Sequence, residues 1–241
     1  MVERRDREAV ATFFSPESLS AGHVTTLGSF EARHAKVRRI DVGAGVRLVD
    51  GAGTVGWGQL VQLTKTQASV EVTSVDHVEP LPEIHLMVPV ADRDRMLLLA
   101  EKATEMGAAS WRPVIWHRSR GVSPRGEGIA FQSRARSRMI SALTQCGGAW
   151  LPSIHPDATL ARAIAACPTG TRWLLDADGD LPTIGRGSGP VTIAAGPEGG
   201  LEPQERDVLL QAGFEPVKLA PLTLRFETAA IAGMALARAA L

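Results

Sequence analysis

Two stretches near the C-terminus decide the fold: Ala194-Ala195-Gly196-Pro197-Glu198-Gly199-Gly200 and Leu219-Ala220-Pro221-Leu222-Thr223-Leu224-Arg225-Phe226-Glu227-Thr228-Ala229-Ala230. Each follows a short apolar run and precedes a helix-like pattern, which places it at the carboxyl end of a predicted strand. Open α/β sheets bind their ligands at that edge. Both stretches are therefore predicted to be loops of a binding site.

The first loop combines glycines with one proline and one carboxylate. Glycine has no Cβ, so backbone N–H and C=O groups in this loop can approach a ligand closely. Glu202-Pro203 then predicts the start of a helix, with Pro203 at its first position, and Gly213 predicts its end.

The second loop is apolar and turns at Pro221. It brings Arg225 and Glu227 into the first turn of an alanine-rich helix that runs to the C-terminus. The helix dipole favours a carboxylate at this position but disfavours an arginine, so Arg225 needs another reason to be there. A charged pair beside an apolar loop predicts a ligand that is partly hydrophobic and partly polar.

These loops resemble the C-terminal signature of the SPOUT superfamily of S-adenosyl-L-methionine-dependent RNA methyltransferases, through Gly-Pro-Glu-Gly-Gly-Leu at 196–201 and Leu-Thr-Leu-Arg-Phe-Glu-Thr-Ala at 222–229. The closest match is the RsmE type, which methylates N3 of a uridine in 16S ribosomal RNA. Other segments resemble further motifs of this family in the same order: Phe13-Phe14, residues 34–39, residues 101–107, Arg118-Ser119 and residues 141–146. The resemblance covers nearly the whole chain.

The resemblance implies an architecture and a set of partners. Residues 79–241 would form an α/β SPOUT methyltransferase domain, a mainly parallel sheet with helices on both faces and a trefoil knot. Residues 1–78 would form a PUA-like RNA-binding β-barrel. The expected partners are S-adenosyl-L-methionine, 16S ribosomal RNA or the small ribosomal subunit, and a second copy of the chain. The residues implied to bind the cofactor are Gly196, Pro197, Gly199, Gly200, Leu219, Leu222, Leu224, Thr228 and Ala229.

The residues themselves also predict two parts. From Thr12 to Val72, short apolar pieces broken by glycine, serine and proline predict a small β-barrel with one helix from Ser29 to Ile40. Val78-Glu79-Pro80-Leu81-Pro82 predicts a stiff connector. From residue 84 onward, alternating strand and helix patterns predict a mainly parallel sheet covered on both faces.

Composition excludes several classes. A hydrophobic content of 44% is ordinary for a globular protein, and no apolar run approaches the roughly 20 residues that span a membrane. We therefore expect a cytoplasmic protein with no membrane contact. Cys146 and Cys167 lack the spacing of a metal or redox site, so reduced thiols and no metal are expected. Asp178-Gly179-Asp180 is interpreted as a turn.

Charge bears on how RNA is bound. The chain holds 26 basic and 26 acidic residues, so any RNA contact must come from local basic clusters. One predicted cluster lies on the helix of residues 29–40 and consists of Arg33, His34, Lys36, Arg38 and Arg39. Its place beside a β-barrel favours contact with phosphates over a merely solvated helix face. Arg118 and Arg120 form a second predicted cluster, in a loop.

The chemistry of N3 methylation assigns roles to the charged residues. N3 of uridine carries a proton at neutral pH, so a base must remove it or a cation must stabilise the uridine anion. Arg225 is the predicted cation. Glu198 and Glu227 are candidates either for the base or for holding Arg225 in place, and the sequence does not rank them.

Two positions depart from the family pattern. Phe226 replaces a small polar residue, and Gly148-Ala149-Trp150 lacks the arginine that the family carries near this point. Trp150 could stack on a base, or belong to the core or a dimer interface. These departures keep two alternatives open: methylation of transfer RNA or of a ribose 2′-oxygen, and a non-catalytic RNA-binding or ribosome-assembly protein.

Overall fold

The computed structural model describes residues 9–119, 129–181 and 189–241, which divide into two compact units. The first unit comprises the described residues up to Pro80 together with Leu143–Leu151. The second unit comprises Leu81–Ala142 and Pro152–Leu241. Arg120, one of the predicted RNA contacts, lies outside the described residues. None of the helices in the described ranges is both long and apolar enough to cross a membrane.

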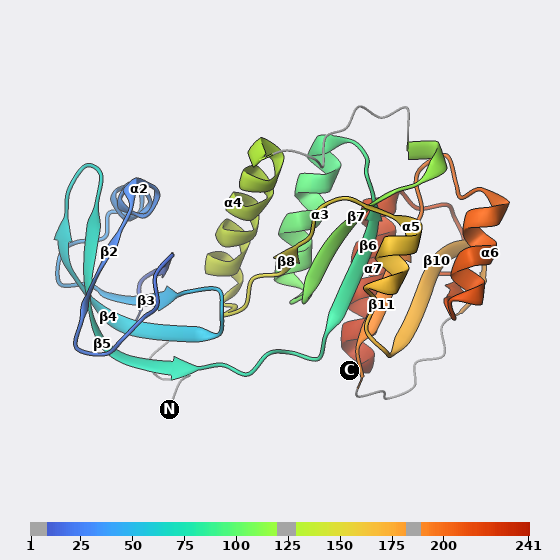
Figure 1. The fold of residues 1–241 in the computed structure, drawn as a ribbon. Coiled ribbons are helices and arrows are strands. Elements are labelled where there is room, and N and C mark those ends of the chain that lie inside the picture. Colours follow the sequence, from blue (N-terminus) through green and yellow to red (C-terminus); the bar gives the residue numbers. More distant parts are fainter. Residues whose placement is uncertain (1–8, 120–128, 182–188) are drawn as a thin grey trace. The chain divides into compact units, whose positions relative to one another are not determined.

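The first unit is built on a five-stranded sheet (Figure 1). Its first pair of strands is parallel and the other pairs are antiparallel. In order across the sheet the strands are β1 (Thr12–Phe14), β3 (Gly45–Val49), β4 (Thr54–Leu63), β5 (Ala68–His77) and β2 (Val24–Leu27).

The segment Asp50-Gly51-Ala52-Gly53, whose glycines and aspartate favour a turn, joins β3 to β4 as a hairpin. Asp50 Oδ1 accepts hydrogen bonds from the backbone N–H groups of Ala52 and Thr54, at 2.8 and 3.0 Å. Strand β4 continues through a β-bulge at Gly58, where an added Cβ would lie 2.2 Å from the carbonyl oxygen of Glu71. Glycine here permits close approach of two strands rather than ending one.

Helix α2 (Ser29–Val37) buries Ala32 and Ala35 against the first unit's core. It was predicted to reach Ile40 but ends at Val37, because the chain reverses there. The N–H of Arg39 donates to the carbonyl of Lys36 (3.0 Å), and the N–H of Ile40 donates to that of Ala35 (2.9 Å). This is the Schellman pattern, in which glycine usually occupies the left-handed position.

Arg39 occupies that left-handed position with a φ of 54°, and no other non-glycine residue in the described ranges has a positive φ. A side chain in this conformation costs about 1 kcal/mol. We expect Arg39→Gly to raise the free energy of unfolding of the first unit by about 0.5–1 kcal/mol, measured by chemical denaturation.

Arg38→Gly is the matched control, because Arg38 lies one residue earlier with an ordinary φ of −83°. Glycine at that position should lower the free energy of unfolding, by about 0.5–1 kcal/mol. Equal effects of the two substitutions would show that Arg39 carries no backbone strain.

The second unit is built on a seven-stranded sheet whose strand pairs are all parallel among the described residues. The predicted mainly parallel α/β sheet is confirmed. The strands in order are β12 (Glu215–Val217), β10 (Thr171–Asp180), β11 (Val191–Ala195), β6 (Ile84–Pro89), β7 (Ser110–Ile115) and β8 (Ser153–Ile154), with β9 (Ala158–Thr159) also paired to β7.

Helices cover both faces of this sheet (Figure 1). Leu174 and Ala194 pack in one core cluster with Leu209 of α6. Their neighbours on the same strands, Leu175 and Ile193, point to the other face and contact Gly233 of α7. Such alternation is what a strand buried on both sides requires. The helices of this unit are α3 (Arg93–Glu105), α5 (Leu160–Ala165), α6 (Pro203–Gln211), α7 (Phe226–Ala240) and α4 (Ile129–Cys146) up to Ala142.

Capping residues set the helix ends near the positions read from the sequence. Asp92 Oδ1 accepts from the N–H groups of Asp94 and Arg95 at the start of α3, at 3.1 and 3.2 Å. Glu202 and Glu205 form a capping box at the start of α6. These local hydrogen bonds fix where α3 and α6 begin.

The segment Asp178-Gly179-Asp180 was predicted to be a turn, and this is wrong. In the structure it is the bulged end of strand β10. A Cβ on Gly179 would lie 2.5 Å from the backbone carbon of Pro216, so the glycine allows β12 to pair closely. No group of three or more His, Cys, Asp or Glu side chains in the described ranges is placed to hold a metal ion.

Candidate functional site

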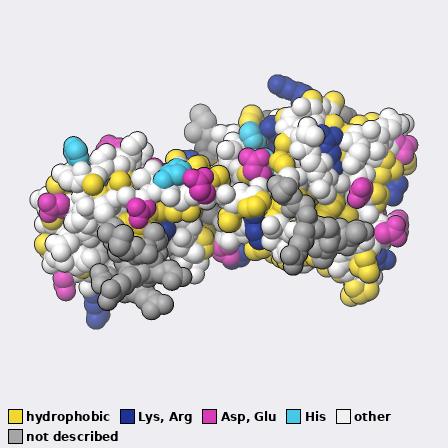
Figure 2. All heavy atoms as spheres, turned by 90° about the horizontal axis from the view of Figure 1, so that it is seen from below, with side chains coloured by type: hydrophobic (Ala, Val, Ile, Leu, Met, Phe, Trp, Pro, Cys, Tyr) yellow, Lys and Arg dark blue, Asp and Glu magenta, His cyan; other side chains and the backbone are white. Residues whose placement is uncertain are grey.

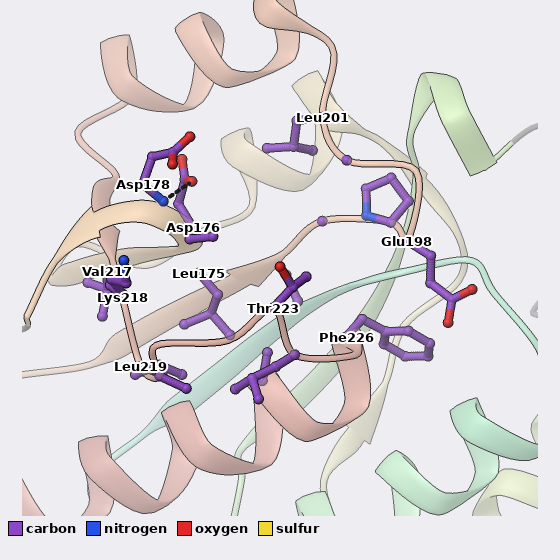
Figure 3. Close-up of a pocket in the computed structure, with 18 of the residues that line it drawn as sticks. Leu175, Asp176, Asp178, Glu198, Leu201, Val217, Lys218, Leu219, Thr223 and Phe226 are labelled. Atoms are coloured by element: carbon purple, nitrogen blue, oxygen red, sulfur yellow. Dashed lines mark hydrogen bonds between the residues drawn. The ribbon is translucent and has the colours of Figure 1, made fainter.

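A pocket of about 360 Å³ opens at the carboxyl ends of β10, β11 and β12 (Figure 3). Residues of both predicted site loops line it, together with the end of β10 and the first turns of α6 and α7. This is the edge at which parallel sheets place their ligands. The two loops, separated in sequence, thus form one site.

Most of the residues expected to bind a cofactor line this pocket. They are Gly196, Pro197, Gly200, Leu219, Leu222, Leu224 and Ala229. Gly199 and Thr228 are exposed and do not line it. Glu198 lines the pocket, whereas Arg225 and Glu227 lie beside it, next to Phe226, which does line it.

Arg118, a predicted RNA contact, lies against the first site loop. Its Nε donates to Glu202 Oε1 at 2.8 Å, and its Nη1 donates to the carbonyl oxygen of Gly199. A Cβ on Gly199 would lie 3.3 Å from the Arg118 side chain. Arg118 therefore holds the loop in place, and a contact with RNA remains a prediction for it.

One end of the pocket is polar and charged. Asp176 Oδ2 accepts from Arg206 Nε at 2.8 Å, and its Oδ1 accepts from the N–H of Asp178 at 3.0 Å. Lys218 lines the same end (Figure 3). None of these polar residues was among the site residues expected from the sequence. Leu201 and Leu224 contribute apolar surface to the lining of the same pocket.

Arg95 of α3 is the charged residue that sequence reasoning missed. It forms an ion pair with Glu198, and its Nε lies 3.8 Å from Glu227 Oε1. The side chain of Glu227 is only 8% exposed, and its Oε2 has no hydrogen-bond partner among the described residues. Arg95 thus links the first loop, through Glu198, to the start of α7, through Glu227.

A signal for Arg95 was present in the sequence. It lies in the first turn of a helix, where the dipole disfavours a cation, the same argument that had singled out Arg225. Arg225 itself is exposed at the N-cap of α7 and makes no side-chain hydrogen bond or ion pair within the described ranges. Its guanidinium is thus exposed beside the pocket, between the lining residues Leu224 and Phe226.

The predicted basic cluster lies on α2 and the turn after it, in the first unit. Arg33 and Lys36 of the helix, and Arg38 and Arg39 of the turn, are exposed. His34 is half-buried, with its ring edge-on to Phe13 at 5.6 Å between centroids. Burial, followed by the charge of Arg38, lowers the pKa of His34, so this residue contributes packing rather than a positive charge.

Trp150 is engaged in packing within the first unit. Its Nε1 donates to the carbonyl of Val78 at 2.7 Å, and its ring contacts His77 edge-on at 5.7 Å. An added Cβ on Gly53 would meet the indole at 2.4 Å. This arrangement favours the structural interpretation of Trp150 over base stacking.

Arg95→Met tests the link between the loops. The substitution keeps much of the apolar stem but leaves the buried carboxylate of Glu227 without its cation, so we expect the free energy of unfolding to fall by about 1–3 kcal/mol. Adding Glu227→Gln to Arg95→Met should recover part of that loss, because the buried charge is then removed. Chemical denaturation of the three variants measures both effects.

Arg93→Met serves as the control, since Arg93 lies on the same helix without an ion pair among the described residues. It should change the free energy of unfolding by less than about 0.5 kcal/mol. If Arg95→Met lowers the free energy of unfolding no more than Arg93→Met does, then Arg95 does not stabilise the buried charge of Glu227.

The family described as RNA methyltransferase domain matches residues 78–238, more than half of the chain. The crystal structure of ribosomal RNA small subunit methyltransferase E from Neisseria gonorrhoeae, bound to S-adenosyl methionine, is similar with a TM-score of 0.84. That protein is 30% identical, and the alignment covers 93% of this chain and 95% of that one.

Two sequence relatives carry the same name. Ribosomal RNA small subunit methyltransferase E of Aquifex aeolicus is 27% identical over 227 residues, which cover 91% of this chain and 95% of that protein. Its namesake from Synechocystis is 26% identical over 230 residues, covering 92% of this chain and 74% of that protein. The resemblance seen in the two site loops is confirmed: this chain belongs to the RNA methyltransferase family.

Proposed function

We propose that this chain transfers a methyl group from S-adenosyl-L-methionine to N3 of a specific uridine in 16S ribosomal RNA. The observation that carries the proposal is a single pocket formed by both site loops in a chain of the RNA methyltransferase family. Relatives named as ribosomal RNA small subunit methyltransferase E support the RNA substrate, and one was crystallised with S-adenosyl methionine. The choice of uridine N3 rests on the resemblance of the loops to the RsmE type.

The pocket suits this cofactor in size and chemistry. Its volume of about 360 Å³ lies within the range of roughly 300–1,000 Å³ for small-molecule sites. Leu201, Leu219 and Leu224 offer an apolar surface for a purine, while Asp176 and Asp178 can accept hydrogen bonds from hydroxyl or amino groups. When bound, the cofactor supplies a methyl group on a positively charged sulfur.

The protein's side chains then make the acceptor reactive. A bond forms between N3 and the methyl carbon as the carbon–sulfur bond breaks, and the proton of N3 passes to a base. Arg225, exposed at the rim, donates hydrogen bonds to the carbonyl oxygens beside N3 and stabilises the negative charge there. Glu198 and Glu227 are both candidate bases, and Arg95 orients both carboxylates. The uridine must be unpaired or flipped out for N3 to be reached.

The first unit is the proposed RNA-binding module. Its five-stranded sheet would be the PUA-like β-barrel expected for residues 1–78, with the exposed basic residues of α2 contacting phosphates. On the face shown in Figure 2, basic and acidic side chains are interspersed, which agrees with RNA contacts from local clusters. Arg118 and Arg120 would add the second cluster.

The remaining expectations belong to the same proposal. Residues 79–241 would carry the trefoil knot of SPOUT domains and pair with a second copy of the chain to form a homodimer. Small side chains along α7 would permit close packing of two such helices. The activity is assigned to the cytoplasm, where ribosomal subunits are assembled.

The decisive test is methyl transfer from labelled S-adenosyl-L-methionine to small ribosomal subunits that lack the modification, and to protein-free 16S RNA. We expect 3-methyluridine when the RNA is digested and its nucleosides are identified by mass spectrometry. A different methylated nucleoside would support transfer RNA or ribose 2′-oxygen methylation. No methylated nucleoside, from protein shown to bind the cofactor, would support the non-catalytic alternative.

Arg225 provides the matched variants for this assay. Arg225→Ala should lower kcat by about 100-fold or more, because one charge-stabilising donor is lost, while the affinity for the cofactor stays the same. Arg225→Lys keeps a positive charge and should retain part of the activity. An Arg225→Ala enzyme as active as the parent would remove this residue from the mechanism.

A further inference from the structure

A row of polar residues crosses the sheet of the second unit near the amino ends of its strands. The strand register places Arg172 beside Thr192, Thr192 beside His85, His85 beside Ser110, and Ser110 beside Ser153. Buried parallel strands are normally apolar throughout. Within this row Thr192 and Ser110 are buried, so their polar side chains break the local pattern, as is expected at functional sites.

A cavity of about 390 Å³ lies along this row. It lies toward the amino edge of the sheet, because its lining residues include residues at the beginning of β7, β8 and β11, whereas the methyl-transfer pocket lies at the carboxyl ends of β10, β11 and β12. The end of α5 covers it. The polar residues that line it are Glu83, His85, Ser110, Arg112, Ser153, His155, Cys167 and Thr192.

Thr192 places a poorly satisfied hydroxyl at this cavity. The residue is 1% exposed, and among the described residues Oγ1 has only the thiol of Cys167 beside it. That thiol is a weak hydrogen-bond partner, and it donates to the carbonyl oxygen of Ala163 at 3.3 Å. A buried hydroxyl with so weak a partner indicates a ligand that would complete its hydrogen bonds.

Arg112 supplies an uncompensated positive charge. It lies two residues after Ser110 on β7, hence on the same face, and it is half-buried with no ion pair or hydrogen bond in the described ranges. The carboxylate among the lining residues, Glu83, is engaged by His85, at 3.1 Å from Nε2. His85 Nδ1 in turn lies 2.8 Å from Ser110 Oγ.

His155 also lines the cavity, as a neutral ring beside the positive charge of Arg112. Burial, followed by the charges of Arg112 and His85, lowers the pKa of His155. The histidines and Cys167 do not make a metal site, because no group of three or more such side chains in the described ranges can hold an ion. A free arginine at the wall also disfavours a cation. The electrostatics therefore favour a negatively charged ligand.

We propose that this cavity binds a small phosphorylated molecule, whose phosphate oxygens accept hydrogen bonds from the guanidinium of Arg112 and the hydroxyl of Thr192. The planar fork of arginine matches the geometry of phosphate. The cavity is several times larger than a phosphate group, so it also holds an organic part of the ligand. The site is independent of methyl transfer.

Nuclear magnetic resonance of the full chain tests this site without S-adenosyl-L-methionine or RNA. The probes are ribose 5-phosphate and inorganic phosphate, with ribose as the uncharged control. We expect saturable shifts of the His155 ring signals with both phosphates and none with ribose, and a rise in the pKa of His155 on binding. Ribose 5-phosphate should bind more tightly than inorganic phosphate; equal affinities would contradict an organic ligand.

Three variants test which side chains bind ribose 5-phosphate. Arg112→Met and Thr192→Val should each weaken binding of ribose 5-phosphate at least about tenfold, the loss of one good hydrogen bond to a charged group. Thr192→Val keeps the side-chain shape and should fold with undiminished stability, so its loss of binding cannot come from unfolding. Arg162→Met, at an exposed arginine of α5 outside the cavity, should bind like the parent.

Two results would overturn the proposal. One is the absence of any saturable His155 shift with either phosphate. The other is an unchanged dissociation constant in both Arg112→Met and Thr192→Val, which would place the binding elsewhere. Cofactor affinity, measured by calorimetry on the same variants, should stay at the parent value, so failure here leaves the proposed methyl transfer untouched.

Discussion

The guanidinium of Arg95 reaches carboxylates at both halves of the methyl-transfer site, and the geometry of that site depends on this contact. Glu198 belongs to the first loop and Glu227 to the start of α7, two segments that no hydrogen bond between their own side chains joins in the described structure. Glu227 is buried, and a buried carboxylate is tolerated only with a compensating charge. Arg95 thus allows an acidic residue to stay beside the pocket and ties the two loops to α3.

The sheet of the second unit separates two kinds of chemistry. At its carboxyl edge, glycine-rich and apolar loops form the methyl-transfer pocket, and Arg118 holds the first of them through Glu202 and Gly199. At its amino edge, a polar row and a free arginine line a second cavity. Between them, apolar residues such as Leu174 and Ile193 alternate toward helices on the two faces. A rigid parallel sheet can thus carry both sites without coupling them.

Much of this architecture was predictable because its signals are local. Asp92 caps α3 and Pro203 begins α6, as the sequence indicates, and the alternation of strands and helices predicts the parallel sheet. The two site loops could be read from glycines and charges beside apolar runs. β8 and β9 were missed, since each has only two residues and no pattern of its own.

The unpredicted features depend on residues far apart in the sequence. Arg95 meets its carboxylates more than a hundred residues away, and although each of these residues stands out locally, no local pattern pairs them. The segment Leu143–Leu151 belongs to the first unit, where Arg47 donates to the carbonyls of Gly147 and Gly148, at 3.1 and 3.4 Å. Contacts between side chains so far apart in the sequence depend on the tertiary structure. The local periodicity of the sequence does not predict them.

Hydrogen exchange of the full chain, followed by mass spectrometry with and without S-adenosyl-L-methionine, tests most directly whether the two loops form one cofactor site. Amides of residues 196–201 and of residues 219–225 should become protected together when the cofactor binds, while amides lining the cavity at the amino edge should not change. Protection of only one loop, or of neither, would contradict a shared pocket.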